Sequence, residues 1–163
     1  MKALTILVAE DDLLSRMVLE RSVIQWGHQM VSAVDGESAL ESLRTRSFDI
    51  CLLDWDMPKM TGIEVCKWLR TTAMVPKPYV ILITGRDQPE EIQAGYEAGA
   101  DDYIMKPCDL KYLRRRIASI ADKLSRGEAA LDKAAAESAA NGIAALSPLD
   151  IYLSDLQLMR RKS

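Results

Sequence analysis

The sequence has 163 residues, 48% hydrophobic and 28% charged, which is enough to bury the core of one ordinary soluble domain. Its formal net charge of −3 gives no general reason to expect nucleic acid or an anionic membrane as a partner. The three cysteines (Cys51, Cys66 and Cys108) are irregularly spaced, which argues for free thiols in a reducing compartment. Glu10 interrupts the N-terminal apolar run too early for a signal peptide or a transmembrane span, so we expect a cytoplasmic protein.

Five short apolar runs follow one another along the chain and are expected to be strands. They occupy residues 4–9, 30–34, 50–53, 79–83 and 103–105. Most of them are rich in valine, isoleucine and leucine and lack polar alternation, which is typical of strands covered on both faces. They therefore predict a buried sheet.

The segments between these runs have helical periodicity. Their apolar positions fall within residues 14–24, 39–43, 63–69, 92–98 and 110–124, with Asp12 as the expected N-cap of the first helix and Gly27 as its end. Strand and helix thus alternate five times within about 125 residues, which predicts an α/β fold with a parallel sheet and helices on both faces. Alternation alone permits several doubly wound orders, of which we predict the flavodoxin-like five-stranded order 2-1-3-4-5.

The composition changes after residue 126, and we place a domain boundary there. Residues 1–126 form the expected compact domain, and residues 127–163 the expected helical extension. The first part of this extension is dominated by alanine and resembles a helical linker. The last part is an amphipathic helix, whose apolar stripe consists of Leu149, Tyr152, Leu153, Leu156 and Met159.

Polar residues follow the predicted strands at the edge where doubly wound sheets bind their ligands. Glu10 and Asp11 follow the first strand, Asp54 the third, Thr84 the fourth and Lys106 the fifth. Crowded carboxylates repel one another unless a cation neutralises them, and oxygen ligands without histidine or cysteine suit Mg²⁺. A carboxylate beside Mg²⁺ can attack phosphorus, and an ammonium and a hydroxyl can stabilise the charge of the transition state.

Four sequence motifs carry a resemblance to a known family. They are ILVAEDD at residues 6–12, LLDWDMP at 52–58, ITG at 83–85 and GADDYIMKP at 99–107. In this order and at these spacings they resemble the receiver domain of bacterial two-component response regulators, and the resemblance extends from residue 3 to about residue 125. It implies a signalling phosphoacceptor that is not an enzyme, apart from Mg²⁺-dependent self-phosphorylation by small donors and self-dephosphorylation.

The resemblance also implies the chemistry of the acceptor. Asp54 would accept the phosphoryl group from the phosphohistidine of a sensor histidine kinase or a phosphotransfer protein. Asp11 would bind Mg²⁺ directly and Glu10 through water, while Asp54 and the backbone carbonyl of Asp56 would complete the protein's share of the metal site. Lys106 would pair with Asp54 or with its phosphoryl group.

Further roles concern the response to phosphorylation. Pro107 would follow a cis bond that directs Lys106 inward. Thr84 would move to the phosphoryl group and Tyr103 would turn inward, changing the surface of the fourth helix, fifth strand and fifth helix to control an output or a partner. The heptad-like spacing of the fifth helix and the apolar stripe of the tail favour a homodimer. No direct binding to nucleic acid or membrane is expected.

Two residues depart from the common pattern of the family. Cys108 stands where such receivers usually have phenylalanine, and Asp56 adds an acidic side chain at the mouth of the site.

The chain could be the N-terminal part of a longer diguanylate cyclase or serine phosphatase. A haloacid-dehalogenase-like phosphatase would also use Asp54 and Asp56, but Pro58 stands where its motif has threonine. His28 is expected to be a surface residue and a poor phosphotransfer histidine.

Overall fold

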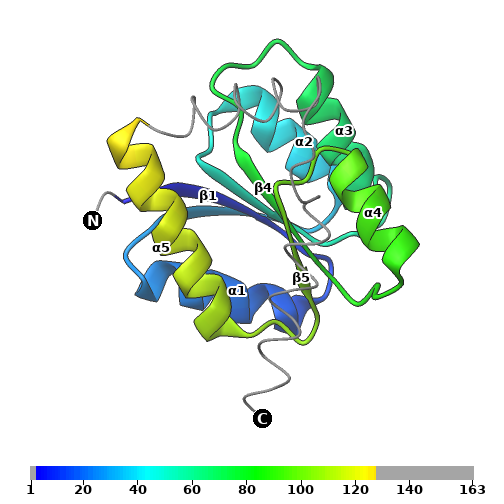
Figure 1. The fold of residues 1–163 in the computed structure, drawn as a ribbon, viewed down its shortest axis with the longest axis horizontal. Coiled ribbons are helices and arrows are strands. Elements are labelled where there is room, and N and C mark those ends of the chain that lie inside the picture. The colour runs from blue at the N-terminus through cyan, green and yellow to red at the C-terminus, as the bar shows by residue number, and fades with distance from the viewer. Residues whose placement is uncertain (1–2, 128–163) are drawn as a thin grey trace, which may run out of the picture. The chain divides into compact units, whose positions relative to one another are not determined.

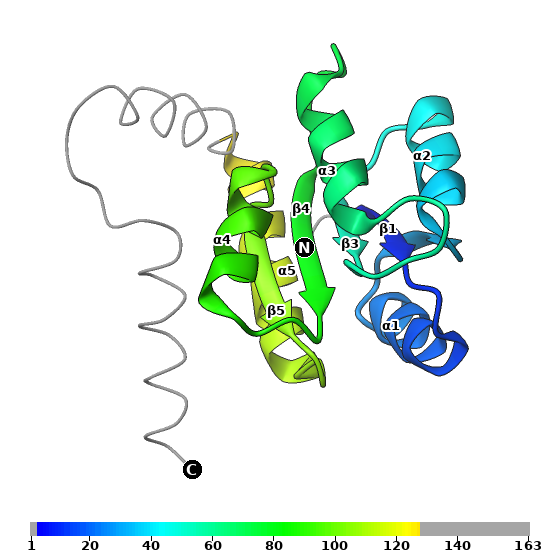
Figure 2. The same cartoon turned by 90° about the vertical axis from the view of Figure 1, so that its right-hand side faces the viewer.

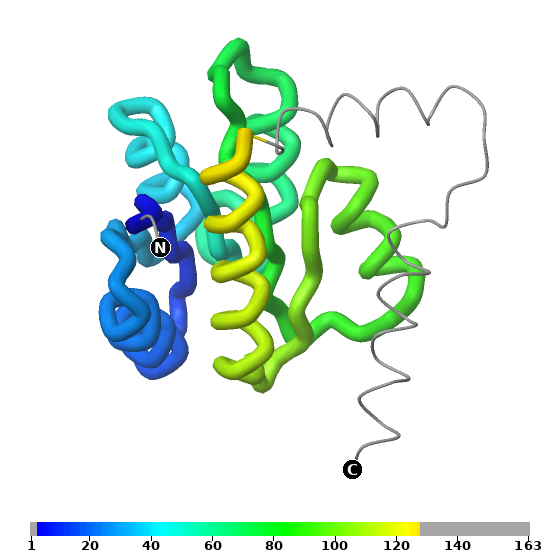
Figure 3. Tube along the Cα trace, turned by 60° about the vertical axis from the view of Figure 1, so that its left-hand side comes forward, coloured from blue at the N-terminus to red at the C-terminus, as the bar shows by residue number. Residues whose placement is uncertain are grey.

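The computed structural model describes residues 3–127, so the predicted linker and C-terminal helix from residue 128 onward lie outside the described residues. Strands and helices alternate throughout this part of the chain, and the alternation can be followed along the trace in Figure 3. The strands are β1 (Thr5–Ala9), β2 (Gln29–Ala33), β3 (Ile50–Leu53), β4 (Tyr79–Thr84) and β5 (Asp102–Met105). The helices are α1 (Leu13–Gln25), α2 (Gly36–Thr45), α3 (Gly62–Thr71), α4 (Pro89–Glu97) and α5 (Leu110–Arg126).

All strand pairs are parallel, and the sheet order is β2-β1-β3-β4-β5, which confirms the predicted flavodoxin-like fold. Helix α1 covers one face of the sheet, and α2, α3 and α4 cover the other (Figure 1). Every residue of β3 is buried, and so are four of the five residues of β1 and five of the six of β4. This double burial explains why the apolar runs show no polar alternation.

The register of the central strands brings two strand ends together. Ala9 is the register partner of Leu53, and the backbone N–H of Asp54 donates to the carbonyl oxygen of Ala9 at 2.9 Å. Glu10, the residue after β1, therefore lies next to Asp54, the residue after β3. Figure 2 shows β3 lying between β1 and β4. The carboxyl ends of these three neighbouring strands therefore lie close to Asp54.

Side-chain caps fix where several helices begin. Asp12 accepts a hydrogen bond from the backbone N–H of Ser15 at 2.8 Å, which confirms it as the N-cap of α1. Asp35 caps α2 and Thr61 caps α3, each in a reciprocal capping box with the residue three positions later. The acidic residues near the site thus include one, Asp12, whose side chain already caps a helix.

The expectation that His28 is a surface residue is wrong. Only 7% of His28 is exposed, and its Nδ1 accepts a hydrogen bond from the backbone N–H of Leu4 at 3.3 Å. The turn after α1 runs directly into β2, whose first residue, Gln29, donates to the carbonyl oxygen of Leu4 at 2.8 Å. This pairing carries the ring beneath the start of β1, and burial lowers the pKa of His28.

Two features of the helices complete the fold. In α5, Leu113, Ile117 and Ile120 are buried, whereas Arg114 and Arg115 are exposed, as expected for an amphipathic helix. Among residues 3–127, no helix is both long enough and apolar enough to cross a membrane.

Candidate functional site

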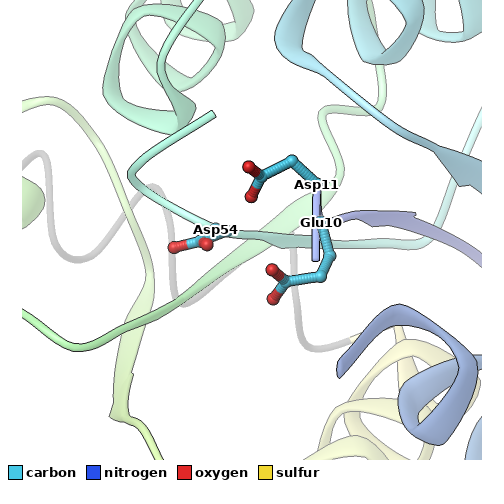
Figure 4. Close-up of side chains that lie close together, drawn as sticks. All are labelled: Glu10, Asp11 and Asp54. Atoms are coloured by element: carbon cyan, nitrogen blue, oxygen red, sulfur yellow. The ribbon is translucent and has the colours of Figure 1, made fainter. Parts of the chain in front are cut away.

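Three of the predicted carboxylates meet at the carboxyl ends of β1 and β3. One carboxylate oxygen from each of Glu10, Asp11 and Asp54 lies within 4.8 Å of the others. Figure 4 shows the three side chains around a common space, with Glu10 and Asp11 from the end of β1 and Asp54 from the end of β3. This is the grouping that the neighbouring positions of the two strands predict.

These carboxylates differ in burial and share one cation. Glu10 is 1% exposed and Asp54 is 6% exposed, whereas Asp11 is exposed. The Nζ of Lys106 lies 2.7 Å from Oδ2 of Asp54 and 2.8 Å from Oε2 of Glu10. A single ammonium group therefore faces two buried carboxylates, with a third carboxylate at the rim.

Burial and pairing act in opposite directions on these groups. Burial raises the pKa of Glu10 above its ordinary value, although the hydrogen bond from Lys106 works against this rise. Burial alone would lower the pKa of Lys106, but its hydrogen bonds with Asp54 and then Glu10 raise it. Lys106 is therefore held in its charged form next to Asp54.

Lys106 is positioned by the turn that follows β5. Its backbone N–H donates to the carbonyl oxygen of Thr84 at 2.9 Å, and its peptide bond with Pro107 is cis. Thr84 is the last residue of β4 and is fully buried. The predicted hydroxyl and ammonium thus lie at the ends of adjacent strands.

Tyr103, the other predicted switch residue, lies inside the structure. It is fully buried in β5, and its hydroxyl donates to the carbonyl oxygen of Arg86 at 2.7 Å. The ring lies 6.4 Å from that of Tyr96 in α4, measured between centroids. The side chain is therefore in the inward position and in contact with the loop that follows Thr84.

Asp56 contributes to the site through its backbone, and its side chain is directed elsewhere. Its backbone N–H donates to Oδ1 of Asp54 at 3.3 Å. Its carboxylate forms an ion pair with Arg86 at 2.7 Å and is not among the three clustered carboxylates. The role predicted for Asp56 in metal binding involves its backbone carbonyl, which this ion pair leaves unaffected.

Arg86 is a residue of the site that sequence reasoning missed. It lies in the loop between β4 and α4, where it contacts Trp55, Asp56 and Glu91. No periodicity or motif points to an exposed loop arginine. The sequence offers one signal for it: Arg86 lies two residues after Thr84, just as the acidic Asp56 lies two residues after Asp54.

The fold and the site define an α/β signalling domain with a buried, lysine-paired aspartate, and comparisons with known proteins agree. A family model described as "Response regulator receiver domain" matches residues 6–118. The chain therefore belongs to this family and is a receiver domain of two-component signal transduction. Receiver domains interact with histidine kinases and generally bind Mg²⁺, and the acidic cluster here could hold a metal ion.

Two relatives illustrate how much of a longer protein is matched. The transcriptional regulatory protein AfsQ1 of Streptomyces coelicolor is 34% identical over 96% of this chain and 72% of its own length. The response regulator MprA of Mycobacterium ulcerans is 40% identical over 77% of this chain and 54% of its own length. The chain thus spans about half the length of MprA.

Solved structures show the same fold. The receiver domain of the Francisella response regulator 1452 has a TM-score of 0.70 at 29% identity, covering 74% of this chain and 98% of that one. The BeF3-activated receiver domain of DrrB has a TM-score of 0.68 at 28% identity, covering 74% and 99% of the two chains.

Proposed function

We propose that Asp54 accepts the phosphoryl group, from the phosphohistidine of a sensor histidine kinase or of a phosphotransfer protein. A carboxylate oxygen of Asp54 would attack phosphorus, the bond from phosphorus to the imidazole nitrogen would break, and the imidazole would keep the electron pair. The observation that carries the proposal is the 2.7 Å contact between Lys106 and the buried carboxylate of Asp54. The ammonium group is placed to stabilise negative charge on the transferred group.

Mg²⁺ is the metal ion that the acidic residues fit best. Glu10, Asp11 and Asp54 offer clustered hard oxygen ligands, and the described residues add no histidine or cysteine to this group. Asp11 would bind the ion directly and Glu10 through water, with the backbone carbonyl of Asp56 as a further ligand. When bound, the ion supplies charge neutralisation for the carboxylates and the phosphoryl oxygens.

Phosphorylation would act on the protein through Thr84 and Tyr103. A phosphoryl group on Asp54 would attract the hydroxyl of Thr84, which now accepts a hydrogen bond from the backbone N–H of Arg86 at 3.3 Å. The backbone carbonyl oxygen of Arg86 also accepts a hydrogen bond from the hydroxyl of Tyr103. A change at Thr84 can therefore reach β5 and α4 through the loop that contains Arg86. The surface of these elements would then favour a different partner.

The output of the full protein is also part of the proposal. The name of AfsQ1, a transcriptional regulatory protein, favours control of transcription over the diguanylate cyclase or serine phosphatase outputs. The domain would act in the cytoplasm, where it meets its kinase, and a homodimer through α5 and the segment from residue 127 onward would transmit the change. Residues 1–126 would form the phosphoacceptor domain, and the remaining residues would connect it to the output.

Chemical phosphorylation tests the acceptor. Incubation with acetyl phosphate and Mg²⁺ should add one phosphoryl group, seen by intact-protein mass spectrometry, and Asp54→Asn should abolish it. Asp87→Asn is the matched control, because Asp87 is an exposed aspartate in the loop between β4 and α4. Labelling of Asp54→Asn at the wild-type level would refute the assignment. Steady hydrolysis of p-nitrophenyl phosphate would instead support the phosphatase alternative.

A further inference from the structure

The guanidinium group of Arg86 is held by three side chains from two other segments. Its Nη2 donates to Oδ1 of Asp56 at 2.7 Å and its Nε to Oδ2 at 3.0 Å, which makes the pair bidentate. Its Nη1 donates to Oε1 of Glu91 at 2.6 Å. Its Cζ lies 5.1 Å from the centroid of the Trp55 ring. The charged group is therefore fixed in position, as bidentate and stacked arginines are.

The backbone of Arg86 is anchored as well. Its N–H donates to Oγ1 of Thr84 at 3.3 Å, and its carbonyl oxygen accepts from the hydroxyl of Tyr103 at 2.7 Å. Both ends of the pair between Arg86 and Asp56 are thus tied to groups of the phosphoacceptor site. The backbone N–H of Asp56 itself donates to Oδ1 of Asp54 at 3.3 Å.

This arrangement determines what the Asp56 carboxylate can do. The backbone N–H of Asp56 lies 3.3 Å from Oδ1 of Asp54, so a carboxylate released from Arg86 could turn toward a water molecule at a phosphoryl group on Asp54. Such a carboxylate can act as a general base, provided that it lies within hydrogen-bond reach of the water. Here both of its oxygens are occupied by Arg86 instead.

We propose that Arg86 is a positioning residue that holds the Asp56 carboxylate away from the acceptor and thereby preserves the aspartyl phosphate. The inference rests on the proposed function of Asp54. Without Arg86, a water oxygen would attack phosphorus while its proton passes to the Asp56 carboxylate. The bond from phosphorus to the Asp54 oxygen would break with its electron pair remaining on Asp54, and inorganic phosphate would leave. Asp56 would then return its proton to solvent.

The decisive measurement is the lifetime of the phosphoryl group in four forms of the full chain. Wild type, Arg86→Gln, Asp56→Asn and the double variant are labelled with acetyl phosphate, freed of the donor and followed by intact-protein mass spectrometry. We expect Arg86→Gln to shorten the half-life about tenfold, less than the roughly hundredfold effect of a fully positioned base. In the Asp56→Asn background, the additional loss of Arg86 should change the half-life by less than about twofold, because neither of these two proteins has a carboxylate at this position.

Two further variants separate positioning from general structural damage. Arg86→Lys keeps a positive charge near Asp56 but cannot form the bidentate pair, so its half-life should lie between those of Arg86→Gln and wild type. Arg70→Gln is the matched control, because Arg70 forms an ion pair of the same length, 2.7 Å, with Asp101 at the opposite end of the strands. Arg70→Gln should change the unfolding midpoint and leave the half-life unchanged.

Each outcome decides the matter. A wild-type half-life in Arg86→Gln would overturn the inference while leaving the proposed function intact. An equally short half-life in Arg86→Gln and the double variant would also overturn it, because the cause would then be wider access of water and not Asp56. If the wild-type chain takes up no phosphoryl group, the proposed function and the inference fail together.

Discussion

At the level of single residues, the balance of charge around Asp54 determines whether the site needs a metal ion. Lys106 supplies one positive charge to two buried carboxylates, those of Glu10 and Asp54, and Asp11 adds a third carboxylate at the rim. One ammonium group cannot neutralise three carboxylates, and the uncompensated charge makes this cluster favourable for a divalent cation. The same excess charge would assist the transfer of a phosphoryl group only when such a cation is bound.

Asp11 and Asp12 provide a matched pair for testing this interpretation. The side chain of Asp12 is used as the N-cap of α1, whereas the side chain of Asp11 belongs to the acidic cluster. We therefore expect Asp11→Asn to weaken Mg²⁺ binding by about tenfold or more and to leave the unfolding midpoint nearly unchanged. Asp12→Asn should bind Mg²⁺ as the wild type does.

Tryptophan fluorescence can follow this titration, because Trp55 directly follows Asp54. Equal losses of affinity in the two variants would contradict the assignment of Asp11 as a ligand. Arg16→Gln serves as a further control on Mg²⁺ binding. Nη1 of Arg16 donates to the backbone carbonyl oxygens of Glu10 and Asp11 and not to their carboxylates.

His28 gives a prediction of pH dependence that is independent of the acceptor. Burial lowers its pKa below the ordinary 6.5, so the unfolded chain binds a proton more readily than the folded one. The folded state is therefore fully stabilised above about pH 6.5 and loses stability as the pH falls through the lowered pKa. Urea unfolding at a series of pH values should show this loss in the wild type and less of it in His28→Gln. Parallel curves for both proteins would contradict the prediction.

The residues of the site differ in how well the sequence predicted them. Glu10, Asp54 and Lys106 follow buried apolar strands, and the parallel sheet brings such positions to one edge whatever the details of packing. Arg86 could not be found this way, because its position depends on the conformation of an exposed loop. His28 was misjudged because nothing in its local sequence reveals that the start of β1 passes over it.

At the level of elements, the loop after β3 is packed unusually closely against its neighbours. A Cβ added at Gly62, the first residue of α3, would lie 2.0 Å from the backbone oxygen of Asp54. A Cβ at Gly36, the first residue of α2, would lie 1.9 Å from the backbone oxygen of Met60. The backbone of the loop after β3 therefore leaves no room for a side chain at either helix start.

The sequence predicted these elements better than it predicted their boundaries. Residues 79–83 were expected as the fourth strand, and the structure extends it to Thr84. Asp12 caps α1 as predicted, because capping is a local interaction that the sequence reveals. The close approach at Gly62 is a contact between separate segments and leaves no comparable local signal.

Gly62 and Gly85 provide the test at this level. Gly62→Ala should lower the free energy of unfolding by about 3 kcal/mol, because a backbone atom cannot move aside as a flexible side chain can. It should also reduce labelling by acetyl phosphate, since the clash falls on Asp54. Gly85→Ala should change stability by less than about 0.5 kcal/mol, because nothing lies within 4 Å of the added Cβ. Equal urea midpoints for the two variants would refute this account.

At the level of the whole molecule, chemistry and connection occupy different parts of the chain. Every proposed site residue lies between Glu10 and Pro107, within the residues 6–118 that match the receiver family. The alanine-rich and amphipathic segments come later and contain none of these residues. Phosphoryl acceptance and assembly should therefore be separable by truncation.

A chain ending at Arg126 provides the last test. It retains the five strands that the structure describes within residues 3–127, so we expect native circular dichroism and labelling of Asp54 at the wild-type rate. If α5 and the later residues form the proposed homodimer, the full chain should show about twice its own chain mass of 18.2 kDa in light scattering, and the truncated chain should show the mass of a monomer. Phosphorylation should shift the dimer equilibrium of the full chain and leave the truncated chain monomeric. A full chain that is monomeric at high concentration, both with and without phosphorylation, would exclude the homodimer.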